Sequence, residues 1–345
     1  MDSPRTPVTV GPDNQAEVLP TRADASVLRL RQVVRELLIQ ARDQGLLDSG
    51  ELGVAVSGGA DSLALAEAAS HVGTRAGLRV RGLIVDHGLQ PDSAEVAARA
   101  EGHLHQLGVT QVEVLRVTVT GPGGVEAAAR RARYSALRAA LPEGLVLLGH
   151  TLDDQAETVL LGLARGSGPR SIAGMRPLDP PWGRPLLAIP RVTTLAACAS
   201  LGLRPWSDPH NMDPAFTRVR LRHEVLPLLE EVLQGGVADA LARTAVQLRE
   251  DSDALDLIAE GVRAEASDGQ GALDVDTLTR EPAAVRRRVL RGWLLAEGVP
   301  ELTDAHLRRV DALVDEWRGQ GGVWLPGGFV AQRAHGRLRV EIPKC

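Results

Sequence analysis

Cysteine is nearly absent from this chain of 345 residues. The two cysteines, Cys198 and Cys345, lie far apart and form no C-x-x-C pair. Zinc ribbons and cysteine-ligated iron–sulfur sites need closely spaced thiolates, and a disulfide framework needs several cysteines. The sequence therefore argues against all three.

Lysine is equally scarce, since Lys344 is the only one and arginine carries almost all of the positive charge. The formal net charge of −5 argues against a protein that coats nucleic acid nonspecifically. A specific RNA enzyme needs only a local basic face. Cationic contacts must then come from planar guanidinium groups or from histidine.

Long apolar runs are also missing, because none approaches the ~20 residues that span a bilayer. Residues 1–22 are rich in Pro, Thr and Asp and lack the hydrophobic segment of a secretory signal. We predict a disordered lead-in over residues 1–24, no membrane association and a cytoplasmic location.

The first two thirds of the chain alternate between short apolar runs and helical patterns. After a helix over 25–44, strands are predicted at 52–56, 80–85, 112–117 and 145–148, followed in turn by helices at 61–72, 92–107, 125–141 and 153–165. This alternation predicts an α/β fold with an open, mostly parallel sheet and helices on both faces.

The character changes near residue 225, where amphipathic helices follow one another without intervening strands. They are predicted at 227–250, 252–265, 282–297 and 303–318, before short strand-like runs at 323–325 and 338–342. We therefore predict a catalytic domain over 25–228 and a smaller, mainly helical accessory domain over 229–345.

Polar clusters follow three of the predicted strands, at 57–62, 86–88 and 150–154. Ligands of open parallel sheets bind beyond the carboxyl ends of the strands. The three clusters are thus predicted to converge on one crevice.

The first cluster has the composition of a phosphate-binding loop, Ser57-Gly58-Gly59-Ala60-Asp61-Ser62. Glycines let the backbone approach an anion, and the N–H groups at the start of the next helix point at it. The two serines can donate hydroxyl hydrogen bonds to phosphate, and Asp61 can hold Mg²⁺. The alternative is a plain strand-to-helix turn. The Gly-Lys-Ser/Thr ending of the kinase and GTPase P-loop is missing.

This loop resembles the S-G-G-x-D-S pyrophosphate loop of ATP pyrophosphatases, which cleave ATP between the α- and β-phosphates. The resemblance implies the adenine nucleotide alpha hydrolase-like fold and binding of ATP with Mg²⁺.

Further segments resemble motifs of one family within this group, the tRNA(Ile)-lysidine synthetases. The matches run in order along about residues 53–229, and a looser resemblance to the family's accessory domain covers about 280–340. The segments are Asp86-His87-Gly88-Leu89, Glu126 to Tyr134, Gly149-His150 through Glu157-Thr158 to Gly166, Arg184-Pro185-Leu186-Leu187, and Asp208 to Pro227 with Asn211, Arg218 and Arg222.

The family resemblance implies an ATP-dependent ligase whose accessory domain, residues 229–345, binds tRNA. It would adenylate the C2 oxygen of the wobble cytidine in a tRNA(Ile) with a CAU anticodon. Free L-lysine would then be joined to C2, releasing AMP and forming lysidine, which changes codon reading from AUG to AUA. A homodimer is compatible with the sequence.

The acidic helix after residue 150 is predicted to bind the lysine. Asp154 and Glu157 are three residues apart and share a helix face, so we expect them to bind the lysine ammonium. His150 or Asp153 would assist in proton removal or contact Mg²⁺. Acidic residues at a helix start can instead simply favour the helix dipole.

The arginines are assigned from the family motifs. Arg130 and Arg133 would face the phosphates and the lysine carboxylate, whereas Arg131 is expected to point elsewhere. Arg218 and Arg222, on a segment that could be extended, are predicted to contact tRNA phosphates. A solvated surface would explain the same arginines.

Two positions depart from the family pattern. Thr151 stands where a second histidine is common, and Val219 stands where asparagine is usual. Both departures weaken fine assignments, but neither removes a residue assigned to ATP or lysine.

Two other functions are alternatives to the ligase. One is another pyrophosphate-loop enzyme, such as a tRNA thiolase or an amide ligase, for which the chain lacks suitable cysteines. The other is a nucleotide-binding sensor without catalysis, against which the intact Asp61, Arg133, Asp154 and Glu157 argue.

Overall fold

The computed structural model describes residues 24–342 except 91, 123, 167 and 209–211. The predicted lead-in, Asn211 of the fifth family motif, Lys344 and Cys345 thus fall outside the described residues, apart from Asp24. The chain forms two compact units. The first contains residues up to Gly149 with Pro180–Gly183 and Val192–Trp206, and the second contains His150–Asp179, Arg184–Arg191 and Ser207 onward.

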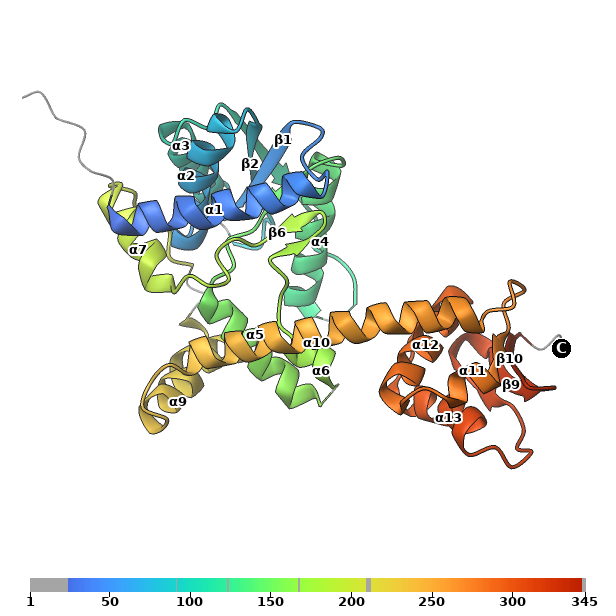
Figure 1. Cartoon of the computed structure of the whole chain (residues 1–345). Helices are drawn as coiled ribbons and strands as arrows, with labels where there is room; N and C mark the ends of the chain where they lie inside the picture. The colour runs from blue at the N-terminus through green and yellow to red at the C-terminus, as the bar shows by residue number, and fades with distance from the viewer. Residues whose placement is uncertain (1–23, 91, 123, 167, 209–211, 343–345) are drawn as a thin grey trace, which may run out of the picture. The chain divides into compact units, whose positions relative to one another are not determined.

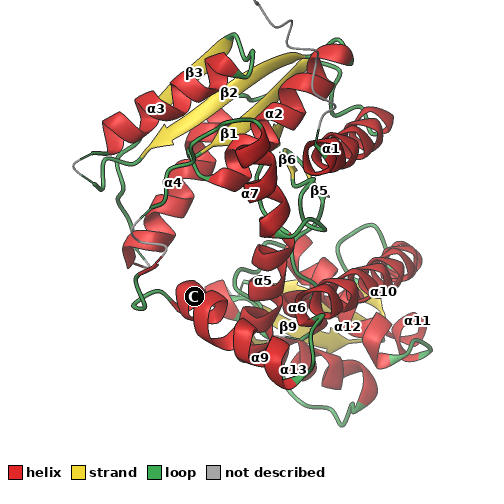
Figure 2. Cartoon of the chain, turned by 90° about the vertical axis from the view of Figure 1, so that its left-hand side faces the viewer, coloured by secondary structure: helices red, strands yellow, loops and turns green. Residues whose placement is uncertain are grey.

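A parallel sheet forms the centre of the first unit. Strands β2 and β4 flank β1, and β3 and β6 follow at either side, in the order β3-β2-β1-β4-β6-β5. Neighbouring strands from β3 to β6 in this order are parallel, as predicted. Figure 2 shows β1, β2 and β3 side by side. The bounds are β1 Glu51–Val56, β2 Arg79–Asp86, β3 Gln111–Arg116, β4 Leu145–Leu147, β5 Leu178–Asp179 and β6 Trp182–Gly183.

Helices cover both faces of this sheet, as the alternating pattern predicted. Glycines set the close approach on one face: an added Cβ at Gly82 of β2 would lie 2.6 Å from Leu104 of α3, and one at Gly73 of α2 would lie 2.7 Å from Val80. Leu137 of α4 packs on the opposite face, and α1 packs against α2 (Figure 1). The helices are α1 Ala25–Asp43, α2 Ala60–Arg75, α3 Ser93–Gln106, α4 Gly124–Ala140 and α7 Arg191–Ser200.

The second unit begins with α5 Leu152–Arg165 and α6 Pro169–Ile172. The segment that carries Arg218 and Arg222 is helical, so the extended conformation considered from the sequence is wrong. It consists of α8 Thr217–Arg220, one turn of π-helix at Leu221–Val225, and α9 Leu226–Val232. Helical geometry places residues 218 and 222 on one face because they are four apart.

The predicted boundary between helices 227–250 and 252–265 is also wrong. α9 ends at Val232, and a single helix, α10 Val237–Ala266, runs through the predicted gap. The break occurs at residues 234–236, where Gln234, Gly235 and Gly236 all have positive φ angles, which glycine adopts without strain. α10 then packs against α5, α6 and α12.

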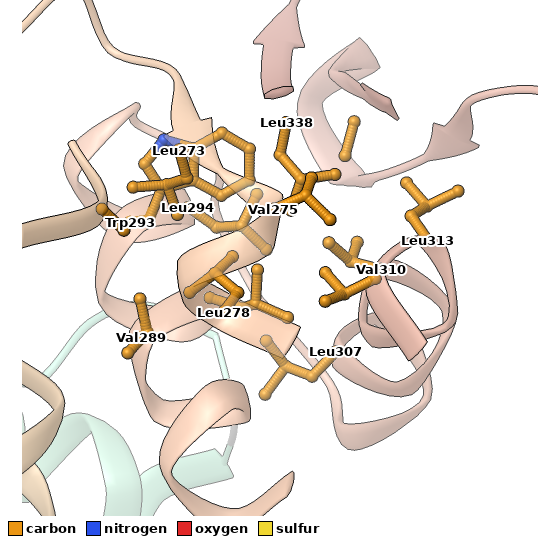
Figure 3. Close-up of a cluster of buried hydrophobic side chains, with 14 of the residues drawn as sticks. Leu273, Val275, Leu278, Val289, Trp293, Leu294, Leu307, Val310, Leu313 and Leu338 are labelled. Atoms are coloured by element: carbon orange, nitrogen blue, oxygen red, sulfur yellow. The ribbon is translucent and has the colours of Figure 1, made fainter. Parts of the chain in front are cut away.

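A separate apolar core holds the end of the second unit together. Leu278, Val289, Leu294, Val310 and Leu338 converge there from three helices and one strand (Figure 3). The elements are α11 Val275–Thr279, α12 Ala283–Ala296 and α13 Asp304–Asp315, with an antiparallel sheet in the order β7 Leu273–Asp274, β10 Arg337–Glu341, β9 Val330–Ala334 and β8 Val323–Trp324. The sequence predicted β8 and β10 but missed β7 and β9. Among the described residues, no helix is both long and apolar enough to cross a bilayer.

Candidate active site

The loop at residues 57–62 connects the end of β1 to the start of α2. Gly59 caps the helix without a side chain, which leaves the first-turn N–H groups accessible to an anion. Gly58 has φ 84°, and its carbonyl accepts a hydrogen bond from the Trp206 amide at 2.9 Å. The loop is thus built for a close backbone approach.

The two serines of the loop differ in role. The Ser62 hydroxyl donates to the Gly59 carbonyl at 2.9 Å and accepts from the Ser57 amide at 3.1 Å. A hydroxyl has one hydrogen to donate, so the buried Ser62 holds the loop in shape. Ser57 is exposed, and it is the better placed of the two to meet a phosphate.

Asp61 lies in the first turn of α2 and is held from a distant helix. The Thr194 hydroxyl of α7 donates to Asp61 Oδ1 at 2.5 Å, and the Thr194 side chain is fully buried. Gly149, after β4, approaches the same turn, where an added Cβ would lie 3.1 Å from the Asp61 backbone. Nothing in the sequence pattern marks Thr194, which lies 133 residues along the chain.

These residues fit a magnesium ion that is shared with phosphate. Mg²⁺ is usually bound by one or two carboxylates together with substrate phosphates, rather than by a cage of protein ligands. Among the described residues there is no group of three or more side chains that could form such a cage. Asp61 at the phosphate loop is a carboxylate that could hold such an ion.

The adjacent strand ends carry the second cluster. Asp86 closes β2 and accepts a hydrogen bond from the Gly88 amide at 3.0 Å. Burial and the positive charge of Arg133 lower the pKa of His87, outweighing the effect of Asp86. His87 is thus favoured in its neutral form, near a guanidinium rather than paired with a carboxylate. Because β1 and β2 are parallel neighbours, residues 57–62 and 86–88 follow the same edge of the sheet, as predicted. Residues 150–154 belong to the second unit.

The arginines of α4 surround Tyr134. The guanidinium carbons of Arg130 and Arg133 lie 4.8 Å and 5.3 Å from the centre of its ring, and Tyr134 stacks edge-on against Trp182. Arg133 Nε is buried without a hydrogen-bond partner among the described residues. Arg131 instead donates to the Pro122 carbonyl, so it points elsewhere as expected.

The two carboxylate oxygens of Asp154, at the start of α5, have different partners. Asp154 Oδ2 accepts hydrogen bonds from the amide and the hydroxyl of Thr151, at 2.8 and 2.9 Å, which forms a capping box. Oδ1 faces Arg222 and Arg191, at 3.1 and 3.4 Å. The helix-start explanation therefore accounts for one oxygen of this carboxylate, while the other oxygen pairs with arginines.

Glu157 lies one turn further on, with its side chain fully buried. Arg222 bridges to its Oε1 at 2.6 Å, and Arg218 lies 3.4 Å from its Oε2. Arg222 contacts both carboxylates, which confirms that Asp154 and Glu157 share a face. We call Asp154, Glu157, Arg191, Arg218 and Arg222 the acid–arginine cluster.

Burial and charge act in opposite ways on the two carboxylates. Burial is the largest influence on Glu157 and raises its pKa, despite the counteracting charge of Arg222. Burial would also raise the pKa of Asp154, but the Arg191 charge and the Thr151 amide, with smaller contributions from His150 and Arg222, outweigh it and lower that pKa. Asp154 is therefore the firmly ionised member of the pair.

Other residues of the family motifs form hydrogen bonds with the backbone. Asp153 accepts a hydrogen bond from the Arg191 amide at 2.9 Å. Gln155 exchanges two hydrogen bonds with the Met175 backbone, and buried Arg184 donates to the Arg176 carbonyl. Arg191, which completes the cluster, is the first residue of α7. It was not predicted from the sequence because no motif marks this position.

Two family models match parts of this chain. A PP-loop domain model matches residues 29–229, and a TilS substrate binding domain model matches residues 273–339. The chain is 57% identical over 318 residues to a tRNA(Ile)-lysidine synthase of Rhodococcus erythropolis, covering 91% of this chain and 95% of the relative. It is 58% identical over 296 residues to the Nocardia farcinica enzyme of that name, covering 84% and 91%.

Among solved structures, the fold is similar to that of the U34-tRNA thiolase NcsA from Methanococcus maripaludis. The TM-score is 0.53 at 19% identity, over 65% of this chain and 80% of the other. That similarity concerns the fold alone. On its sequence relatives and its PP-loop domain, the chain belongs to the tRNA(Ile)-lysidine synthase family of ATP-using ligases.

Proposed function

We propose that this chain adenylates the C2 oxygen of the wobble cytidine in a tRNA(Ile) with a CAU anticodon and then joins L-lysine to C2. The cytidine oxygen attacks the α-phosphorus of ATP and pyrophosphate leaves. An amine of lysine then attacks C2, loses a proton, and AMP leaves with the former cytidine oxygen. The product, lysidine, would change codon reading from AUG to AUA.

The first step calls for positioning and charge neutralisation. In this proposal, residues 57–62 hold the phosphates, Asp61 holds Mg²⁺, and Arg130 and Arg133 neutralise the departing pyrophosphate. The support is the open helix start at Gly59 and the buried, unpaired Nε of Arg133. When bound, Mg²⁺ would withdraw charge from the leaving group.

The second step requires a cation site for lysine. The observation that carries the proposal is the pair of carboxylates on one face of α5, both already contacting the guanidinium of Arg222. Carboxylates that bind a guanidinium offer the same charge to a lysine ammonium. His150, whose charge influences Asp154, is proposed to accept the proton.

The tRNA assignment of Arg218 and Arg222 is linked to the lysine assignment. Each arginine occupies carboxylate oxygens that the ammonium would use. An arginine that turns to an RNA phosphate would free a carboxylate for lysine, so tRNA binding and lysine binding are proposed to support each other. The Arg218 side chain is 37% exposed, which supports its access to RNA.

The test uses the full chain, ATP, labelled lysine and total tRNA. We expect label in a modified cytidine, dependent on ATP, together with ATP–pyrophosphate exchange that requires tRNA. Nucleotide binding without exchange would favour the sensor and overturn the proposal. We place the reaction in the cytoplasm, where ATP and tRNA meet.

A further inference from the structure

A groove lined by arginines lies between α10 and α12 in the second unit. It encloses about 270 Å³. Its floor is apolar, with Ala259 and Val289 buried. Four guanidinium groups line it, from Arg170, Arg263, Arg288 and Arg291. We call it the arginine groove.

The charges in the arginine groove are only partly compensated. Asp256 pairs with both Arg170 and Arg288, at 2.6 and 2.9 Å. Among the described residues, neither Arg263 nor Arg291 has a carboxylate within 4 Å. With Glu260 as the second acid in the lining, four guanidinium groups face two carboxylates. The groove is thus positive in a chain whose net charge is −5.

Two neighbouring arginines of α12 form ion pairs that hold helices together in this unit. Arg286 is 3% exposed, and both it and Arg287 bond to Asp311 of α13. Arg291 lies on the same helix without any such acid. Packing therefore explains Arg286 and Arg287 but not Arg263 and Arg291.

The lining chemistry indicates what the groove can bind. No aromatic or amide side chain lines it, so it lacks the groups that stack on bases or read their edges. Guanidinium groups pair well with phosphate oxygens, often through two hydrogen bonds. A phosphodiester backbone therefore fits the groove better than a base does.

We propose that the arginine groove binds the sugar-phosphate backbone of the tRNA substrate, with Arg263 and Arg291 contacting phosphate oxygens. This rests on the proposed function for the presence of a tRNA. It extends the RNA-binding surface beyond residues 273–339, the range of the substrate-binding domain match, because Arg263 belongs to α10. Contacts of this kind position the RNA without reading its sequence.

The first test measures tRNA binding at several salt concentrations by the full-length double variant Arg263→Ala/Arg291→Ala. We expect affinity to fall about tenfold per arginine, and the slope of log K against log salt to shrink by about one unit per lost phosphate contact. Arg309→Ala, an exposed arginine of α13 outside the groove, is the matched control and should change neither quantity. Unchanged affinity and slope in the double variant would overturn the proposal, as would an equal loss in the control.

A second pair of variants keeps all four arginines. Gly292 lines the groove and is exposed, and an added Cβ would meet no atom closer than 3.9 Å, at Arg263. Gly292→Glu adds a negative charge there, while Gly292→Gln adds nearly the same shape without charge. We expect the glutamate variant alone to bind tRNA about tenfold more weakly, with both variants equally folded by circular dichroism. Equal binding by the two would contradict an electrostatic groove.

The outcomes separate this proposal from the proposed function. Wild-type protein that binds tRNA through the groove but forms no lysidine would overturn the function and keep the groove. Lysidine formation with variants that bind tRNA normally would do the reverse. Competition by an acidic peptide but not by RNA would assign the groove to a protein partner and overturn the proposal.

Discussion

In the proposed function, the loop at residues 57–62 binds an anion and the acid–arginine cluster binds a cation, and the two are built from the chain in different ways. The loop uses backbone N–H groups, one exposed hydroxyl and one carboxylate from six consecutive residues. The cluster uses charged side chains, with Asp154 and Glu157 on α5 and arginines from further along the chain. The Asp154–Arg191 and Asp154–Arg222 pairs are separated by 37 and 68 residues. Anion binding by a helix start is therefore encoded locally, whereas cation binding by buried carboxylates depends on distant counter-charges.

The reason for this difference is the cost of burying charge. An ionised carboxylate away from water is strongly destabilising unless it is paired and hydrogen-bonded. Glu157 is fully buried and needs Arg222 and Arg218. Asp61 is only partly buried, and the Thr194 hydroxyl donates a hydrogen bond to it.

The largest effect is expected at the loop, from Asp61→Asn. Loss of the charge proposed to hold Mg²⁺ should lower the rate of adenylation about a hundredfold or more, with little change in fold because the carboxylate lies at a helix start. The measurement is tRNA-dependent ATP–pyrophosphate exchange. Asp153→Asn, which alters a carboxylate bonded to a backbone amide, should leave exchange far less affected. Unchanged exchange in Asp61→Asn would remove the magnesium role.

Glu157→Gln tests the other half of the comparison. We expect the KM for lysine to rise by about tenfold to a hundredfold, since a hydrogen-bonded charge contributes about 1.5–3 kcal/mol, while the KM for ATP changes little. Steady-state lysidine formation with each substrate varied in turn gives both values. An equal rise for ATP and lysine would show that Glu157 does not distinguish the two half-reactions.

Thr194→Val asks whether the loop, too, depends on a distant residue. Removal of the hydroxyl that bonds Asp61 Oδ1 should lower exchange about tenfold and raise the Mg²⁺ concentration needed for half-maximal rate. Binding of Mn²⁺, followed by electron paramagnetic resonance, provides a readout other than activity. Thr194→Ser keeps the hydroxyl and should restore both quantities; if serine behaves like valine, the effect is one of packing.

Arg218→Ala compares the RNA and lysine assignments at one residue. A phosphate contact predicts that the salt slope for tRNA binding falls by about one unit. Release of Glu157 Oε2, which Arg218 contacts at 3.4 Å, predicts tighter binding of lysine in the absence of tRNA. Filter binding and calorimetry measure the two effects. If neither quantity changes, Arg218 contributes neither to tRNA binding nor to lysine binding.

The smallest effects concern stability and pH. Because the pKa of Glu157 is raised, the folded state holds its proton more tightly, and the stability from this group is present below its ordinary pKa of 4.5 and is lost as pH rises through the folded value. Urea unfolding from about pH 4 to about pH 7 should therefore show Glu157→Gln gaining on the wild type as pH rises. Asp154 has a lowered pKa, so its contribution is complete above 3.8 and is lost as pH falls through the folded value. Asp154→Asn should accordingly be less stable than the wild type at neutral pH, and a gain there would contradict the assigned pKa shift.

The local sequence determined the alternation of strands and helices, the loop at residues 57–62 and the shared face of Asp154 and Glu157. Each of these follows from spacing along a few turns or one strand, where hydrophobic period and glycine placement act directly. The same local signals failed at 233–236, where two glycines and Gln234 end one helix and allow the next.

Only the tertiary structure decided which groups surround the charges. Thr194 reaches Asp61 from another helix, Arg191 and Arg222 meet Asp154, and the short strands β7 and β9 form by pairing with β10. Neither residue type nor sequence spacing predicts such partners. A buried charge or an unpaired strand edge is satisfied by whichever group the fold brings near it, and that proximity is set by the packing of the whole unit.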